Sequence, residues 1–243
     1  MAHESTESRL AVVTGGNRGI GLEVCKQLGE AGWHVVLCAR DVNAGAQAVE
    51  RLQADRLSVE CRRLDVARSE HSRAMGQYLF DTYGSVDLLV NNAGVMLESS
   101  REKGRRSSDV LEVSPQTLME VFNVNTLGAV RLSQALVPLM GEGARIVNVS
   151  SGMGALNDMD GGWAGYRMSK AALNALTRVL HARLAERGIL VNSVCPGWVN
   201  TRLGGANAPV SPERAAADIV WLGTSPEVTT GGGFFRRRNP IPW

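Results

Sequence analysis

The chain has 243 residues, with 26 Lys plus Arg against 24 Asp plus Glu and a formal net charge of +2 at pH 7. Hydrophobic residues make up 44% of it and charged residues 21%, which excludes a chain that is disordered throughout. The nearly balanced charge argues against a dedicated nucleic-acid binder, and aromatic residues, at 5%, are too few for a base-stacking platform.

Short apolar runs alternate with amphipathic stretches along the whole chain. We expect strands at residues 10–14, 34–39, 57–64, 86–91, 144–150, 189–195 and 232–235. We expect helices between them, at residues 19–31, 44–54, 70–83, 115–140, 164–187 and 212–222. Several of the strands are almost continuously apolar, as strands covered on both faces are. The pattern predicts one α/β domain over residues 1–243, a Rossmann-type doubly wound parallel sheet of about seven strands with helices on both faces.

The first eight residues are polar and do not form a signal peptide, and we expect them to be flexible. No apolar run approaches the roughly 20 residues that a membrane span needs, so we expect a cytoplasmic protein without membrane contact. The four cysteines form no CxxC pair and show no zinc-like spacing with the four histidines. We therefore expect neither a disulfide framework nor a metal site.

Two basic segments interrupt the apolar pattern. One is the charged stretch with Arg101, Lys103, Arg105 and Arg106, and the other is the triplet Arg236-Arg237-Arg238. Neither interleaves aromatic residues, so we expect no nucleic-acid partner. We interpret the triplet as a solvated surface turn rather than as a phosphate site.

The first strand runs directly into Thr14-Gly15-Gly16-Asn17-Arg18-Gly19-Ile20-Gly21, after which a helix begins. Glycines at these places allow a tight turn, a close backbone approach to a phosphate, and contact between helix and strand. The helix N-terminus then offers its amides and partial positive charge to a pyrophosphate. The position of the loop between a strand and a helix predicts a dinucleotide site rather than a structural turn.

The end of the second strand indicates which dinucleotide fits. Asp41 lies 20 residues beyond Gly21, and by the simple spacing rule it would bind the adenosine ribose and favour NAD. Asp41 also precedes a helical stretch, however, and is better interpreted as its N-cap. Arg40 at the strand tip and Arg18 in the glycine loop would converge on a phosphate. We therefore expect NADP(H) as the cofactor, with NAD(H) as the weaker alternative.

Tyr166 and Lys170 are four residues apart in a helical stretch, so they share one helix face. The pKa of a free tyrosine is near ~10, and a neighbouring ammonium group would lower it toward neutrality. Ser150 and Ser151 stand at the end of the preceding strand. They could be ordinary turn residues, or a hydroxyl there could orient a carbonyl group beside the tyrosine.

Several motifs now occur together and in one order. They are Thr14-Gly15-x-x-x-Gly19-x-Gly21, Asn91-Asn92-Ala93-Gly94, Asn125, Ser151, Tyr166-x-x-Ser169-Lys170 and Pro196-Gly197-x-x-x-Thr201. The combination resembles the short-chain dehydrogenase/reductase family, in its short single-domain branch, over residues 9–235. Residues 15–22, 39–42 and 240–243 look most like the carbonyl reductases of that family, which mostly use NADPH to reduce aldehydes, ketones and quinones.

The resemblance implies a role for each matching residue. Tyr166 would protonate the carbonyl oxygen, Ser151 would position and polarise the carbonyl, and Lys170 would lower the tyrosine pKa and hold the nicotinamide ribose. Asn125 would organise the helix and a water that connects Lys170 to solvent. The residues implied to bind the cofactor are Gly15, Asn17, Arg18, Gly19, Ile20, Gly21, Arg40, Asp65, Val66, Asn92, Ala93, Gly94, Tyr166, Lys170, Pro196, Gly197, Val199 and Thr201.

The expected function is therefore NADPH-dependent reduction of a small carbonyl compound to an alcohol. The alternatives are an NAD-dependent alcohol dehydrogenase working oxidatively and a dinucleotide-binding sensor without chemistry. The chain lacks the long insertion that animal carbonyl reductases carry between Ser151 and Tyr166, so their monomeric state and substrate preference do not carry over. The oligomeric state stays open, with homodimers or homotetramers formed through helices 115–140 and 164–187 among the options.

Overall fold

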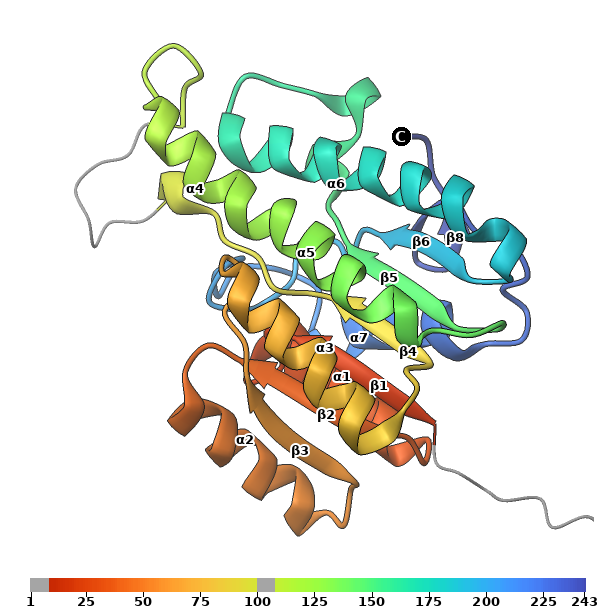
Figure 1. Cartoon of the computed structure of the whole chain (residues 1–243). Helices are drawn as coiled ribbons and strands as arrows, with labels where there is room; N and C mark the ends of the chain where they lie inside the picture. Colours follow the sequence, from red (N-terminus) through yellow and green to blue (C-terminus); the bar gives the residue numbers. More distant parts are fainter. Residues whose placement is uncertain (1–8, 100–107) are drawn as a thin grey trace, which may run out of the picture.

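The computed structural model describes residues 9–99 and 108–243, and Figure 1 shows its helices and strands. The strands are β1 (Leu10–Thr14), β2 (His34–Ala39), β3 (Val59–Arg63), β4 (Leu88–Asn91), β5 (Arg145–Val149), β6 (Leu190–Val194), β7 (Phe234–Arg236) and β8 (Asn239–Pro240). The α-helices are α1 (Gly19–Glu30), α2 (Val42–Ala54), α3 (Ser69–Tyr83), α4 (Pro115–Asn125), α5 (Leu127–Leu136), α6 (Ala164–Leu184) and α7 (Pro212–Thr224). The first eight residues and the basic residues of segment 101–106 lie outside the described ranges.

The described strands form a sheet in the order β3-β2-β1-β4-β5-β6-β7-β8. Neighbouring strands are parallel from β3 to β7, and β8 runs antiparallel to β7. This arrangement confirms the predicted doubly wound parallel sheet. The chain starts at β1, proceeds outward to β3, and then returns to β4 on the other side of β1. The carboxyl ends of β1 and β4 therefore lie side by side at a topological switch point, where such sheets bind ligands.

The described sheet has eight strands, against the about seven that the sequence predicts. The additional strand, β8, is two residues long, and its Pro240 pairs with Phe235 of β7. The turn between the two strands holds Arg237 and Arg238 at left-handed φ angles of 51° and 64°. Both residues of β8 are exposed, so no apolar pattern marks this strand in the sequence.

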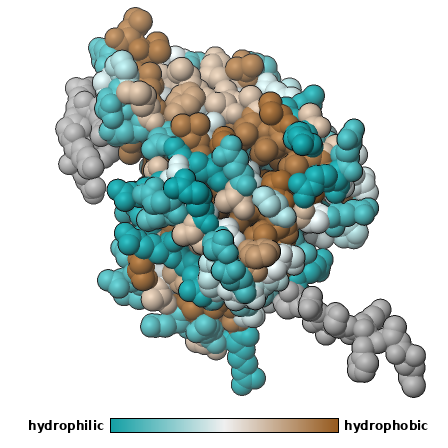
Figure 2. All heavy atoms as spheres, in the orientation of Figure 1, coloured by the Kyte–Doolittle hydropathy of each residue, from teal (hydrophilic) through white to brown (hydrophobic). Residues whose placement is uncertain are grey.

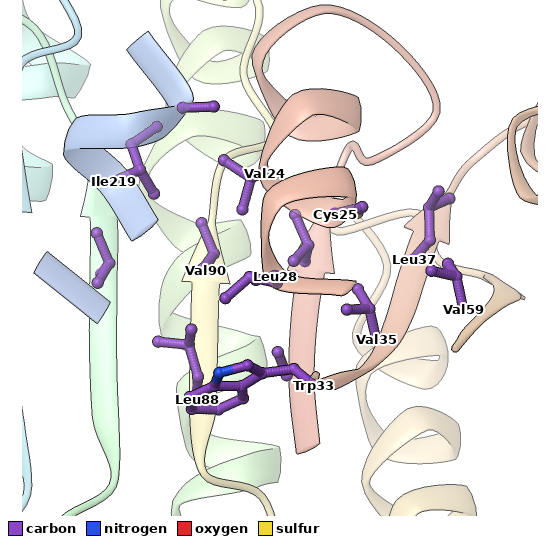
Figure 3. Packing of buried hydrophobic residues seen from close by; sticks show 14 of the residues in the cluster. Val24, Cys25, Leu28, Trp33, Val35, Leu37, Val59, Leu88, Val90 and Ile219 are labelled. Atoms are coloured by element: carbon purple, nitrogen blue, oxygen red, sulfur yellow. The ribbon is translucent and has the colours of Figure 1, made fainter. Parts of the chain in front are cut away.

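Helices cover both faces of the sheet, and each face has its own apolar core (Figure 1). On one face, Leu28 of α1 and Ile219 of α7 pack over the strands, as Figure 3 shows. Helices α3 and α5 pack over the other face. Within β4, Leu88 and Val90 belong to the first core and Leu89 belongs to the second. Burial on both faces explains why this strand is continuously apolar in sequence.

The prediction of a single helix over residues 115–140 is wrong. Helix α4 ends at Asn125 and α5 begins at Leu127, with Thr126 between them at φ −114° and ψ −60°. The hydroxyl of Thr126 donates a hydrogen bond of 2.9 Å to the backbone carbonyl of Ser169 in α6. A contact with α6 therefore determines where the helix is interrupted. The apolar periodicity continues across this position, so the sequence pattern does not indicate the interruption.

Exposed apolar side chains gather over α5 and α6, where Figure 2 shows a brown stretch of surface. Leu127 of α5 is 45% exposed and Val179 of α6 is 66% exposed. The expected association of copies through these helices stays a prediction. Within the described part of the chain, no helix is both long and apolar enough to cross a membrane.

The turn from β1 to α1 is built around two glycines. Gly15 has a left-handed φ of 64°, which glycine adopts without strain. A Cβ atom on Gly21 would lie 2.4 Å from the Gly15 carbonyl oxygen and 2.5 Å from Asn92 Nδ2. Asn92 Nδ2 donates to the Thr14 carbonyl at 2.8 Å, and Thr14 Oγ1 accepts the backbone N–H groups of Asn92 and Ala93, both at 2.9 Å. These bonds fasten the ends of β1 and β4 together at the switch point.

We expect Gly21→Ala to lower the free energy of unfolding by about 1–3 kcal/mol, because the added methyl group overpacks this turn. Gly141→Ala is the matched control, since no atom lies within 4 Å of a Cβ built there. Urea denaturation of the parent chain and of both variants measures the difference. Equal unfolding free energies for the two variants would contradict the crowding at Gly21.

Candidate active site

The carboxyl ends of the central strands open into a cleft of about 2270 Å³. The glycine loop lines one part of it, and Ser151, Tyr166 and the loop after β6 line another. All residues predicted to bind the cofactor border this cleft, namely Gly15, Asn17, Arg18, Gly19, Ile20, Gly21, Arg40, Asp65, Val66, Asn92, Ala93, Gly94, Tyr166, Lys170, Pro196, Gly197, Val199 and Thr201. Of the four predicted catalytic residues, Asn125 is the one that does not line the cleft, and it is buried.

The beginning of α1 is suited to a phosphate group. Arg18 occupies the N-cap position and makes no side-chain capping hydrogen bond, and the first turn contains no acidic residue. The first amides of the helix are therefore left to a ligand or to water, and such a terminus carries partial positive charge. A Cβ atom on Gly19 would lie 3.2 Å from Thr201 Cγ2, so the loop after β6 lies against the glycine loop.

Three arginines come together beside this helix end. Burial lowers the pKa of Arg18, and the positive charges of Arg202 and Arg40 lower it further. Asp41 is occupied elsewhere, because its Oδ1 accepts the backbone N–H groups of Asn43 and Ala44 at 3.0 and 3.1 Å. The interpretation of Asp41 as the N-cap of α2 is thus confirmed. Arg202 was missed in the sequence, because no motif marks it and only the fold of its loop brings it near Arg18.

Tyr166 and Lys170 lie one turn apart in α6, and both are buried. Lys170 Nζ lies 5.7 Å from the centre of the Tyr166 ring and donates a hydrogen bond of 2.7 Å to the Val149 carbonyl at the end of β5. The predicted juxtaposition of the two side chains is confirmed. Ser151 lies just beyond β5, and its hydroxyl is near enough to Tyr166 to act on the pKa of the phenol.

Burial dominates the titration of this pair. It lowers the pKa of Lys170 to about 8, because the charged ammonium is removed from water. It raises the pKa of Tyr166 to about 12, although the hydrogen bond from Ser151 acts in the opposite direction. The expected lowering of the tyrosine pKa by Lys170 is therefore not found. Loss of hydration decides the direction of the shift, and Tyr166 is a neutral phenol near pH 7.

Asn125 links the segment after β4 to α6. Its Oδ1 accepts the Val95 N–H at 2.8 Å, and its Nδ2 donates to the Val95 carbonyl at 2.9 Å and to Ser169 Oγ at 3.0 Å. A Cβ atom on Gly94 would lie 3.4 Å from Asn125 Oδ1 and 3.6 Å from Lys170 Nζ, which shows how closely these groups approach. The implied water between Asn125 and Lys170 stays a prediction.

Glu98 caps the helix that carries the catalytic candidates. Helix α6 begins after Trp163, which has a left-handed φ of 56° and offers no side-chain cap. Buried Glu98 supplies the acceptor instead, and its Oε1 takes the Tyr166 backbone N–H at 2.9 Å. Its negative charge near the helix N-terminus also complements the helix dipole. No motif indicates this contact, because the two residues are 68 positions apart.

Arg167 holds the loop between Ser151 and Tyr166. Its side chain is buried, donates a hydrogen bond of 2.8 Å from Nε to the Gly162 carbonyl, and forms an ion pair with Asp160. It also donates to the Met153 carbonyl at 3.4 Å. Sequence reasoning missed Arg167, since backbone carbonyl partners leave no trace in the residue pattern.

The loop after β6 forms another wall of the cleft. Gly197 has a left-handed φ of 85°, and Val199 forms an isolated bridge with Val210. Trp198 Nε1 donates to the Gly204 carbonyl at 2.8 Å, so its indole stabilises this loop while it lines the cleft.

The arginine triplet departs from its interpretation as a solvated turn. Arg237 and Arg238 are exposed and do lie in the turn after β7. Arg236, however, is only partly exposed, and it borders the cleft together with Arg237. Its Nε donates a hydrogen bond of 3.3 Å to Cys195 Sγ, because parallel pairing of β7 with β6 places the ends of the two strands side by side.

Comparison with known proteins agrees with this geometry. The family model described as short chain dehydrogenase matches residues 9–209. The chain is 32% identical to (+)-neomenthol dehydrogenase of Arabidopsis thaliana, with 99% of both chains covered. It is 30% identical to carbonyl reductase (NADPH) 1 of Sus scrofa, with 98% of this chain and 96% of the relative covered.

Solved structures share the fold over nearly the whole chain. The NADPH-bound carbonyl reductase from chicken fatty liver has a TM-score of 0.85 and 27% identity, with 97% of this chain and 99% of that chain covered. Salutaridine reductase from Papaver somniferum has a TM-score of 0.80 and 30% identity, with 93% and 99% covered. The match over residues 9–209 and the identity to full-length relatives place this chain in the short-chain dehydrogenase/reductase family of oxidoreductases.

Proposed function

We propose that the protein reduces a carbonyl group of a small molecule to an alcohol with NADPH. The observation that carries this proposal is the buried Tyr166–Lys170 pair, next to Ser151 and in the same cleft as the glycine loop. Among its relatives, the carbonyl reductase (NADPH) 1 of Sus scrofa and the NADPH-bound chicken enzyme support both the reaction class and the cofactor.

The cleft suits NADPH in shape and charge. The glycine-rich β1–α1 turn borders the cleft, and the uncapped start of α1 offers its partial positive charge to a pyrophosphate there. Arg18, Arg40 and Arg202 provide guanidinium groups for the additional 2′-phosphate, and Asp41 accepts backbone N–H groups of α2 instead of a ribose hydroxyl. When bound, NADPH supplies the hydride, and the residues of this chain supply binding, orientation and the proton.

In the proposed mechanism, Tyr166 donates its phenolic proton to the substrate carbonyl oxygen as that oxygen gains negative charge. Its raised pKa keeps the proton in place near neutral pH, which suits a proton donor. Ser151 holds the carbonyl oxygen at the tyrosine hydroxyl. Lys170, still protonated below its pKa of about 8, stabilises the phenolate that is left behind. Asn125 and Glu98 position α6, and they do not touch the reacting atoms.

Tyr166→Phe removes the proton donor and retains the ring. We expect carbonyl reduction, followed by NADPH absorbance, to fall by about 100-fold to 10,000-fold, while NADPH binding measured by fluorescence titration stays nearly intact. Tyr83→Phe is the matched control, because it removes a hydroxyl that bonds to His34 at 2.9 Å rather than one that borders the cleft. Substantial residual turnover in Tyr166→Phe would rule out the proposed role.

Arg40→Asp should discriminate between the two dinucleotides. We expect the Kd for NADPH to rise by about tenfold to a hundredfold with a far smaller change for NADH, since a charge-assisted bond to the 2′-phosphate is lost. Arg51→Asp, at the exposed end of α2, makes the same change of net charge away from the cleft. Equal weakening of NADPH and NADH would show that the choice of cofactor does not depend on Arg40.

The pH dependence of reduction follows from Lys170. Burial lowers its pKa to about 8, so the side chain carries its charge below that pH and loses it above. We expect kcat/KM for carbonyl reduction to be level between pH 6 and about 7 and to decline as pH rises through about 8. Steady-state rates in buffers of constant ionic strength test this, and a rise between pH 8 and 9 would contradict it.

A further inference from the structure

Arg236 places a positive charge beside the proposed catalytic residues. It is the last residue of β7, and its Nε donates to Cys195 Sγ at 3.3 Å. The same sulfur accepts the backbone N–H of Gly152 at 3.0 Å. Gly152 directly follows Ser151, so the guanidinium group is held next to the residue that would position the carbonyl.

Gly152 makes room for this arginine. A Cβ atom on Gly152 would lie 1.9 Å from Arg236 Nη2 and 3.2 Å from its Cζ. Gly152 is not among the glycines with a left-handed φ, so its backbone would accept alanine. The lack of a side chain here is therefore a matter of space, and the guanidinium of Arg236 occupies the volume that a side chain at this position would fill.

The guanidinium has no counter-ion in the described part of the chain. Two other arginines that line the cleft have acidic partners, Arg167 with Asp160 and Arg214 with Asp218 at 3.8 Å. For Arg236, no carboxylate of residues 9–99 or 108–243 lies within 4 Å, and the thiol on its Nε is a weak acceptor. A half-buried guanidinium with unused donors is suited to a planar anion that it can bind through two hydrogen bonds.

The phosphates of a dinucleotide are poorly placed to meet this charge. The glycine loop follows β1, whereas Arg236 ends β7, four strands away in the order β1-β4-β5-β6-β7. At a strand spacing of about 4.8 Å, this separation is roughly 19 Å. The groups next to Arg236 are Cys195 and Gly152, and Gly152 directly follows Ser151 at the substrate end of the cleft.

We propose that the preferred substrates are carbonyl compounds that carry a carboxylate, and that Arg236 binds this carboxylate while the carbonyl lies at Ser151 and Tyr166. This inference depends on the proposed carbonyl reduction for its reaction and on Arg236 for its specificity. Arg236 thereby distinguishes acidic from neutral carbonyl compounds, and it takes no part in the proton transfer.

The test compares 4-carboxybenzaldehyde and 3-carboxybenzaldehyde with their methyl esters, which keep the ring and the aldehyde but remove the charge. We expect the parent chain to show a higher kcat/KM for an acid than for its ester. Arg236→Gln should lower this acid-to-ester ratio by about tenfold to a hundredfold, the effect of one charge-assisted contact. Gly152→Ala should lower the ratio as well, because the methyl group displaces the guanidinium.

Arg183→Gln is the control for net charge, since Arg183 is an exposed residue in the last turn of α6, and it should leave the ratio unchanged. Calorimetric binding of the acids gives a readout without turnover, and thermal unfolding shows that each variant is folded. If Arg236→Gln changes neither the acid-to-ester ratio of kcat/KM nor the Kd of the acids, the inference is overturned. Binding of acids that needs Arg236, with no reduction of any aldehyde, would support the anion site and contradict the proposed function.

Discussion

Burial of the Lys170 ammonium beside the Tyr166 phenol constrains how the other elements of the site are arranged. A buried charge is costly unless polar partners replace its water, and the Val149 carbonyl at the end of β5 is the partner that the structure supplies. That bond requires α6 to lie at one fixed height over β5. Glu98 holds the start of α6 by accepting the Tyr166 N–H, and Asn125 holds the next turn by donating a hydrogen bond to Ser169 Oγ.

The same constraint accounts for a feature of the fold that has no local cause. Asn125 must end α4 with its side chain turned toward Val95 and Ser169, and Thr126 bonds to the Ser169 carbonyl. The chain forms two helices here instead of one continuous helix, because Asn125 and Thr126 both form hydrogen bonds with Ser169 in α6. Around this fixed centre, the doubly wound sheet brings the glycine loop from β1 and the proposed anion site from β7 to the same edge.

Much of this could be predicted from the sequence. The strands and most helices follow from apolar runs and their spacing, and the glycine loop and the Tyr166–Lys170 spacing mark the cleft. The positions of Glu98, Arg202 and Arg236 at the site could not be predicted this way, although the basic triplet marks Arg236 as a charged residue. Each reaches the site through contacts with residues distant in sequence; for example, 41 positions separate Arg236 from Cys195. The tyrosine pKa was expected to fall, but a residue pattern contains no measure of burial, and burial decides the direction.

In the proposed reaction, hydride passes directly from NADPH to the carbonyl carbon of the substrate in this cleft. Reduction of an aldehyde with NADPH deuterated at nicotinamide C4, in ordinary water, tests it through the mass of the product alcohol. We expect the carbinol carbon to gain deuterium when the label is on one of the two faces of nicotinamide C4. It should gain none when unlabelled NADPH is used in D2O. Deuterium that enters carbon from the solvent, or an alcohol formed without consumption of NADPH, would contradict it.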